Sequence, residues 1–332
     1  MQEKVKNKKI WIGIGISLIF LYFALKSIEI EKVLKVFGEI NYIYIFPVIF
    51  FTILTYVVRA WRWRYFFRHV KPIRFSSLFS ATMIGFMANN LLPARIGELV
   101  RAYCIGKKEN ISKSMSFATI VLERIFDGFS LLFLFVIVLI FYPFPEEIKR
   151  IGYIFAVIYF VAAGILISIK VWSQQVMKII DFLCSYLPNS LGKAIAGHTH
   201  SFISGLEVLK NGWDVFFILF YSIILWIASA LSVYFMFPCC HLGQLSFINA
   251  LFLLIMITIG LAIPGAPSSV GTFQYFTMLG LSVFGVDKNI GLTFAIILHI
   301  TQWVVPVFIG WFYLCKEQIS FGEITSSGGK NV

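Results

Sequence analysis

The chain has 332 residues, of which 59% are hydrophobic and only 13% are charged. Soluble domains carry about 25% charged residues and could not bury this much apolar surface, so the composition excludes a soluble globular fold and indicates a polytopic membrane protein. The formal net charge of +12 is assigned to basic loops that set membrane topology and contact anionic lipid, and no nucleic-acid partner is predicted.

The first apolar run follows a lysine-rich N-terminus, and no small-residue cleavage site comes after it. We therefore expect a retained first span with the N-terminus in the cytoplasm. Further apolar runs along the chain are long enough to cross a bilayer. The predicted spans are residues 9–26, 42–58, 114–142, 151–172, 213–238 and 289–314.

Three polar segments between the spans orient them. Residues 26–41 are predicted to form an amphipathic helix on the outer surface, and 173–212 a cytoplasmic loop with amphipathic helices. Residues 59–74 are rich in basic and aromatic side chains, which is typical of a cytoplasmic interface anchored by residues such as Trp61 and Trp63. In this threading most of the 28 Lys and Arg residues face the cytoplasm, and so does the C-terminus.

Two long apolar stretches, 75–106 and 246–285, are interrupted in the middle. The first breaks at N-N-L-L-P-A-R-I-G-E, residues 89–98, and both of its ends lead into basic segments. It is therefore predicted to be a re-entrant helical hairpin that enters and leaves on the cytoplasmic side. The second breaks at I-P-G-A-P-S-S-V-G, residues 263–271, and is predicted to be a hairpin that enters from the outside.

The order of these elements repeats along the chain. Residues 1–142 and 151–315 each read span, span, hairpin and span, with opposite orientation in the membrane. Such inverted repeats are common in secondary transporters, whose substrate site lies where the broken segments meet. The predicted fold is an all-α polytopic membrane protein, with residues 1–332 as a single domain of about six spans and two re-entrant hairpins.

Charged residues occur at the first break and on the span that follows it. They are Arg95, Glu98, Arg101, Glu123, Arg124 and Asp127. A charge at the bilayer centre costs about 2.5–3.5 kcal/mol on insertion scales, but paired charges are tolerated in a protein interior. One interpretation is a structural ion-pair network. The other is an anion site, because Pro93 would start a half-helix whose free N–H groups favour negative charge.

The second break carries no charge and offers hydroxyl, amide and backbone groups instead. Its spacing Pro267-x-x-x-Gly271 matches Pro93-x-x-x-Gly97 at the first break. His299, on the last predicted span, is expected to be a buried structural histidine. A plain re-entrant turn remains an open alternative to a binding role.

Motifs for common cofactors and catalytic centres are missing from the sequence. Cys239, Cys240 and His241 are adjacent, and adjacent cysteines rarely hold one ion well, so no metal is predicted. The chain has no P-loop, HExxH, GxSxG or CxxC pattern. We therefore predict no cofactor and no catalytic residue, which disfavours an ATP-driven pump or a conventional enzyme.

Three stretches, N-N-L-L-P-A-R-I-G-E-L-V-R-A-Y, E-R-I-F-D-G and I-P-G-A-P-S-S-V-G-T-F-Q, resemble a flippase-like membrane family. That family includes the membrane region of the lysylphosphatidylglycerol synthase/flippase, and the likeness covers nearly the whole chain. It implies movement of a lipid between the leaflets of a prokaryotic inner membrane, and a possible homodimer. Gln274 stands where the family usually has Glu, so any proton coupling through that position would be lost here.

The leading hypothesis is a transporter of an anionic or polyprenyl-phosphate lipid, acting without enzymatic chemistry. The predicted substrate-binding residues are Asn89, Asn90, Pro93, Arg95, Gly97, Glu98, Arg101, Glu123, Arg124, Asp127, Pro267, Ser268, Ser269, Gly271 and Gln274. One alternative is a membrane-embedded lipid-phosphate-dependent glycosyl or head-group transferase, with Glu98, Glu123 or Asp127 as base. Another is a lipid-binding scaffold that moves nothing.

Overall fold

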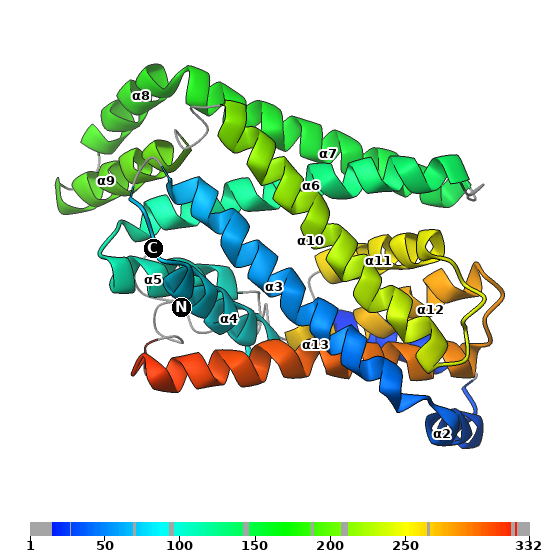
Figure 1. Ribbon diagram of the computed structural model, residues 1–332. Coiled ribbons are helices and arrows are strands. Elements are labelled where there is room, and N and C mark those ends of the chain that lie inside the picture. The colour runs from blue at the N-terminus through cyan, green and yellow to red at the C-terminus, as the bar shows by residue number, and fades with distance from the viewer. Residues whose placement is uncertain are drawn as a thin grey trace. The chain divides into compact units, whose positions relative to one another are not determined.

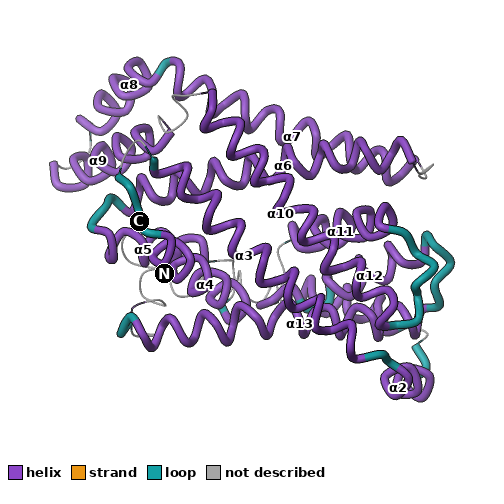
Figure 2. The backbone as a smooth tube through the Cα atoms, in the orientation of Figure 1, coloured by secondary structure: helices purple, strands orange, loops and turns teal. Residues whose placement is uncertain are grey.

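The computed structural model describes residues 15–26, 28–68, 71–92, 96–141, 146–186, 189–206, 212–263, 266–319 and 323. Throughout these residues the regular elements are helices, and none is a strand (Figures 1 and 2). In chain order they are the N-terminal helix Gly15–Leu25, α2 Ile30–Glu39, η1 Tyr42–Tyr44, α3 Ile45–Phe67, α4 Phe75–Leu91, α5 Gly97–Glu109, α6 Lys113–Phe141, α7 Glu146–Val171, α8 Ser173–Ser185, α9 Asn189–Leu206, α10 Gly212–Cys239, α11 Phe247–Ala262, η3 Pro267–Ser269, α12 Thr272–Ser282 and α13 Lys288–Lys316.

Four stretches of helix are long and apolar enough to cross a membrane, and they coincide with predicted spans. They are Tyr42–Phe67, Lys113–Phe141, Gly212–Cys239 and Lys288–Lys316. A fifth candidate is the pair Ala156–Ile169 and Ser173–Cys184, whose axes meet at 82°. The predicted first span, 9–26, is described only from residue 15 onward. The all-α membrane class is therefore confirmed, whereas six spans and the inverted repeat stay predictions.

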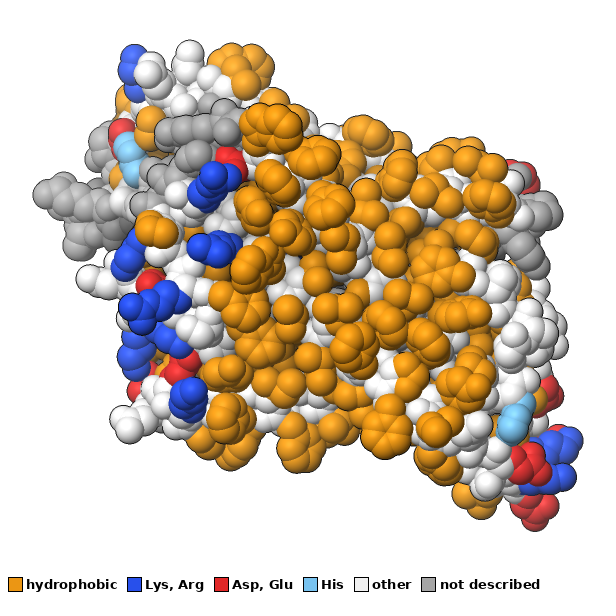
Figure 3. Space-filling model, in the orientation of Figure 1, with side chains coloured by type: hydrophobic (Ala, Val, Ile, Leu, Met, Phe, Trp, Pro, Cys, Tyr) orange, Lys and Arg blue, Asp and Glu red, His pale blue; other side chains and the backbone are white. Residues whose placement is uncertain are grey.

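The surface of these helices is apolar, as a lipid environment requires. Large hydrophobic side chains such as Phe46, Ile140 and Phe308 are mostly exposed, and hydrophobic residues cover most of the face drawn in Figure 3. A soluble protein rarely exposes apolar patches of this extent. Membrane insertion would cover them with lipid chains.

Helix α3 extends further than the predicted span 42–58. It continues through the arginine- and tryptophan-rich sequence to Phe67, because Arg and Ala are good helix formers and no Gly or Pro interrupts this segment. Consequently Trp63, expected as an interface anchor, is fully buried, whereas Trp61 is 38% exposed. The anchoring interpretation was wrong for Trp63, whose side chain belongs to the interior.

Both interrupted stretches form helical hairpins. In the first, the amide N–H of Gly97 donates to Asn89 Oδ1 (2.8 Å) beside the break, and Lys108 Nζ lies 3.1 Å from Ser80 Oγ farther away. The first contact joins residues close to the break, and the second joins residues far from it on both helices. This order shows that α4 and α5 run antiparallel. Residues 93–95 in this break lie outside the described part of the chain.

In the second hairpin, α11 packs directly against α12. Gly260 of α11 lies against Phe276, and Gly280 of α12 lies against Leu253 and Met256. A side chain at either glycine would collide with the facing helix, so the small residues permit the close antiparallel packing. The side from which each hairpin enters the membrane remains a prediction.

The chain forms two compact units that interleave along the sequence. The first comprises Met1–Tyr56, Phe86–Gly97 and Leu225–Tyr313, and the second Val57–Gly85, Glu98–Ile224 and Leu314–Val332. Helices α3, α4, α10 and α13 contribute residues to both, and α5 begins at Gly97 of the first unit and continues in the second. The second break belongs to the first unit, and the charged residues of α5 and α6 belong to the second.

Candidate functional site

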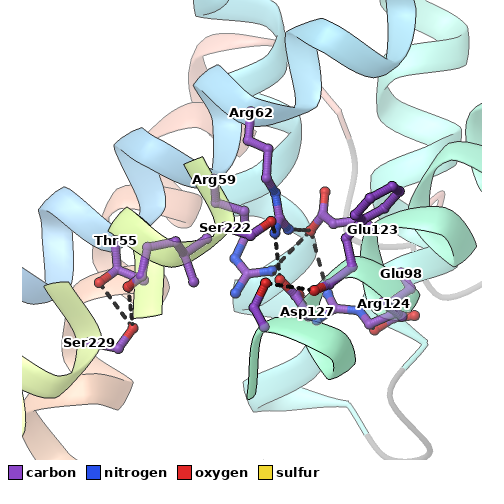
Figure 4. Close-up of polar contacts among 12 residues, drawn as sticks. Thr55, Arg59, Arg62, Glu98, Glu123, Arg124, Asp127, Ser222 and Ser229 are labelled. Carbon is purple, nitrogen blue, oxygen red and sulfur yellow. Dashed lines mark hydrogen bonds and ion pairs between the residues drawn. The ribbon is translucent and has the colours of Figure 1, made fainter. Parts of the chain in front are cut away.

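A cluster of buried charges forms in the second unit around α6. Glu123 and Asp127 are one helical turn apart and therefore share a face of this helix. Both are buried, at 0% and 4% exposure. Figure 4 shows their carboxylates facing Arg59 and Arg62 of α3 and Arg124 of α6 itself. The periodic polar stripe on an otherwise apolar helix thus becomes an ion-pair centre.

Glu123 is the most heavily paired carboxylate of this cluster. Its Oε1 lies 3.0 Å from Arg59 Nη1 and 3.3 Å from Arg62 Nη2. Arg101 binds both of its oxygens, Nη1 to Oε1 at 2.9 Å and Nη2 to Oε2 at 3.0 Å. This two-point contact uses the planar fork of the guanidinium and fixes its orientation.

Asp127 binds a second set of donors. Arg59 Nη1 lies 2.9 Å from Oδ2, and Arg62 Nη1 lies 2.6 Å from Oδ1. Arg62 Nη1 also donates to Ser222 Oγ of α10 at 2.6 Å. Arg59 and Arg62 are three residues apart on α3 and are buried, at 6% and 0% exposure. They therefore connect α3, α6 and α10 through the two carboxylates.

Arg101 is held by an aromatic wall as well as by Glu123. Its guanidinium lies 3.7 Å from the centre of the Trp63 ring, and the Trp63 Nε1–H donates to Thr119 Oγ1 at 2.9 Å. Stacking on an aromatic face stabilises a desolvated guanidinium. Arg101 is 1% exposed, so this wall and Glu123 replace the water that it has lost.

The cluster has one half-open edge, formed by Arg124 and Glu98. Arg124 Nε lies 2.9 Å from Glu98 Oε1, and Nη1 lies 3.3 Å from Asp127 Oδ2. The side chains of Arg124 and Glu98 are 36% and 28% exposed, unlike the other members. A ligand arriving from outside the cluster would meet this pair first.

The described cluster carries one positive charge in excess. Four arginines, at positions 59, 62, 101 and 124, face three carboxylates, at 98, 123 and 127. The Nε–H groups of Arg62 and Arg101 are buried, and no hydrogen-bond acceptor for them occurs in the described part of the chain. Buried donors of this kind are normally satisfied by water or a bound acceptor.

The structure brings together most of the charged residues that the sequence singled out. Glu98, Arg101, Glu123, Arg124 and Asp127 all belong to the cluster. Arg95 and Pro93 lie outside the described residues. Gly97 begins α5 beside the first break, where Asn89 caps it, and Asn90 lies next to Asn89 at the end of α4.

Sequence reasoning missed Arg59, Arg62 and Ser222. It had assigned the two arginines to an interface loop, because the surrounding basic residues match that pattern. A signal was nevertheless present: arginines spaced three residues apart, directly continuing an apolar helix, lie on one face of that helix. Arg64 follows Arg62 by two positions, so it lies on another face of α3, and it is exposed.

The second break forms a separate, uncharged polar site in the first unit. His299 Nε2 lies 2.9 Å from the Ser268 carbonyl oxygen and 3.0 Å from Ser268 Oγ, and Nδ1 lies 2.9 Å from Gln274 Nε2. Gln274 Oε1 accepts the Gly271 N–H at 2.7 Å. This set is consistent only if His299 donates from Nε2 and accepts at Nδ1. Predicted as structural, His299 of α13 connects the break at Ser268 to the first turn of α12 at Gln274.

The backbone of the second break is tightly constrained. Ser268, Ser269 and Gly271 have positive φ values of 58°, 57° and 91°. Pro267 starts the short η3 helix, and a Cβ on Gly271 would collide with the backbone oxygen of Ser17. Ser17 Oγ in turn accepts the N–H of Ala266 at 2.7 Å. The N-terminal helix therefore packs directly on the break.

Metal-binding geometry is not found in the described residues, where no three His, Cys, Asp or Glu side chains gather in a suitable group. Cys239 and Cys240 are both buried. The chemistry that the charged cluster offers is recognition of anions by guanidinium groups.

Comparison with known proteins places these features in a family context. A family model described as the lysylphosphatidylglycerol synthase TM region matches residues 10–310. A UPF0104 membrane protein of Methanocaldococcus jannaschii is 25% identical over 93% of this chain and 95% of the relative. Another, of Pyrococcus horikoshii, is 24% identical over 92% of this chain and 96% of the relative.

A shorter similarity connects the chain to an enzyme by name. Glycosyltransferase AglD of Haloferax volcanii is 27% identical over 124 residues, which cover 36% of this chain and 20% of that protein. No solved structure is significantly similar to the chain.

Proposed function

Because the chain belongs to the family of the lysylphosphatidylglycerol synthase TM region, we propose that it is a lipid transporter of the membrane. In this proposal it moves an anionic or polyprenyl-phosphate lipid between the two leaflets. Its proposed location is the cytoplasmic membrane of a prokaryote, in keeping with the archaeal relatives. No catalytic residue is assigned.

One observation supports this function above the others: an arginine-rich cluster with excess positive charge is buried among apolar helices. Arg59 and Arg62 lie on α3 and Arg124 lies on α6, and both helices are candidate spans. Ionisable groups inside membrane segments are costly and usually serve the passage of a polar group. A phosphate complements both the excess charge and the geometry of a guanidinium.

The two parts of the cluster have different tasks in this proposal. The carboxylates of Glu123 and Asp127 hold Arg59, Arg62 and Arg101 in place and are fully engaged. A lipid phosphate would instead approach the half-open edge, where it would replace the Glu98 carboxylate on Arg124. The phosphate would then pair with Arg124 as the carboxylate did, and the part-exposed Glu98 side chain would be released towards water.

The test is leaflet exchange of a fluorescent phosphatidylglycerol in proteoliposomes, followed by a fluorescent polyprenyl phosphate. We compare wild type, Arg124→Gln and Arg150→Gln, which removes an exposed arginine at the start of α7. Wild type and Arg150→Gln should exchange one of the lipids well above empty vesicles. Arg124→Gln should reduce the rate about tenfold, because a charge-assisted contact to phosphate is lost.

Absence of exchange with both lipids would overturn the transport proposal. An equal loss of exchange in Arg124→Gln and Arg150→Gln would show that the cluster has no specific part in transport.

The similarity to glycosyltransferase AglD is the observation that favours the transferase alternative. Appearance of a new lipid product when purified protein is incubated with a polyprenyl-phosphate sugar would favour that alternative.

A further inference from the structure

A pocket of about 300 Å³ lies at the end of α3, in the second unit, and none of its described lining residues belongs to the charged cluster around α6. It is lined by Trp61, Arg64, Tyr65, Arg68 and Pro72. Two arginines and two aromatic rings thus share one concave surface. None of these residues is used by the proposed transport, so the pocket needs an explanation of its own.

The charge of the pocket favours a ligand with one negative charge. Arg68 Nη1 pairs with Asp214 Oδ1 at 3.1 Å, and Asp214 is fully buried. The Arg64 guanidinium lies over the Trp61 ring, 5.6 Å from its centre, and Arg64 is exposed. Among the described residues, these two guanidiniums and one carboxylate leave one positive charge in excess, which a phosphodiester would neutralise.

The aromatic walls are held in position by α10. The Tyr65 ring stacks on Phe217 with centres 5.3 Å apart and an interplanar angle of 21°. Trp61 Nε1 donates to Tyr221 Oη at 3.2 Å. Because both rings are fixed by neighbours, the pocket is already shaped before a ligand arrives, and ordering it costs little on binding.

The position of the pocket along the helix indicates the source of the ligand. Arg64 lies in the last turn of α3, where the candidate span Tyr42–Phe67 ends. Trp, Tyr and Arg gather at this depth in membrane proteins because one part of each side chain is apolar and another is polar. Phosphates of lipid head groups occupy the same level.

We propose that this pocket binds the phosphate of an anionic phospholipid, which stays with the protein and is not transported. Arg64 and Arg68 donate to the phosphate oxygens, and the glycerol backbone with its first methylene groups lies on Trp61 and Tyr65. A neutral zwitterionic lipid would bring its own positive charge towards the two arginines. The pocket therefore selects anionic head groups.

The test counts lipids bound to detergent-purified, delipidated full-length protein by native mass spectrometry. Protein is titrated with short-chain phosphatidylglycerol or phosphatidylcholine, and Arg64→Gln is compared with wild type. The matched control is Arg74→Gln, which removes an exposed arginine six positions beyond Arg68 that does not line the pocket. Wild type and Arg74→Gln should bind the first phosphatidylglycerol about tenfold more tightly than phosphatidylcholine.

Arg64→Gln should abolish that preference, and Trp61→Leu should weaken the binding of both lipids. Equal preference in wild type and Arg64→Gln would overturn the proposal, as would the same loss in Arg74→Gln, which would indicate diffuse surface charge. If millimolar inorganic phosphate displaces the lipid completely and binds alone, the ligand is a free anion, and the lipid assignment is wrong. None of these outcomes depends on transport.

Discussion

Glu98 and Glu123 look equivalent in the sequence, but their side chains have different surroundings. Glu123 is fully buried and contacts Arg59, Arg62 and Arg101. Glu98 is 28% exposed and pairs with Arg124. Removing a carboxylate from a buried network leaves uncompensated charge, whereas a part-exposed pair contributes less because water screens it. Glu123 should therefore determine the stability of the protein, and Glu98 should control access to the site.

The pair of substitutions Glu123→Gln and Glu98→Gln tests this distinction. Glu123→Gln should lower the free energy of unfolding by about 3–5 kcal/mol, because several guanidiniums lose their counter-charge. Glu98→Gln should change it by less than about 1 kcal/mol. Thermal unfolding of the purified protein in detergent measures both. Similar stability losses in the two variants would contradict the division into a buried centre and an open edge.

At the scale of elements, the second hairpin depends on the N-terminal helix. Gly271 combines a positive φ of 91° with a position directly against the Ser17 carbonyl oxygen. Gly285 also has a positive φ, 71°, but its surroundings are open. Both glycines therefore have a backbone that strains other residues, but only Gly271 is also in close contact with another helix. Comparing them distinguishes the two effects.

Replacement by alanine should affect these glycines unequally. Gly285→Ala should lower the free energy of unfolding by about 1–2 kcal/mol, the cost of a left-handed conformation for a residue with a Cβ. Gly271→Ala should cost about 1–3 kcal/mol more, because its methyl group must displace the N-terminal helix. Chemical or thermal unfolding provides the comparison. Equal losses would mean that the helix does not pack on the break as closely as described.

At the scale of the whole molecule, the inverted repeat makes a prediction about topology. The first hairpin is expected to begin and end on the cytoplasmic side, and the second on the outer side. Antiparallel α4–α5 and α11–α12 pairs are the arrangement that such hairpins require. Their ends should therefore be reached by solutes from opposite faces of the membrane.

Cysteine labelling tests that topology in a variant whose five native cysteines are replaced. Arg74→Cys and Ser282→Cys place exposed thiols at the ends of the two hairpins. A membrane-impermeant maleimide added to intact cells should label Ser282→Cys and spare Arg74→Cys, and the pattern should reverse in inverted vesicles. Lys35→Cys and Lys178→Cys test the outer side predicted for residues 26–41 and the cytoplasmic side predicted for residues 173–212. Labelling of both hairpin ends from one side would refute the inverted repeat.

The sequence by itself determined the features that depend only on residues close to one another along the chain. Runs of apolar residues predicted the four candidate spans, and Pro, Gly and charge located the two breaks, because span length and helix interruption are local properties. The polar stripe on α6 also followed from spacing alone. Glu123 and Asp127 were therefore identified without knowledge of their partners.

Only the tertiary structure decided which groups meet. Arg59 and Arg62 resemble interface residues in the sequence, and they become the partners of Glu123 and Asp127 because α3 continues into the interior beside α6. In the same way, packing of α13 against the second break brings His299 to Ser268 and Gln274. The physical reason is that burial makes an unpaired charge or donor costly, and the identity of the nearest partner depends on helix packing that local patterns do not encode.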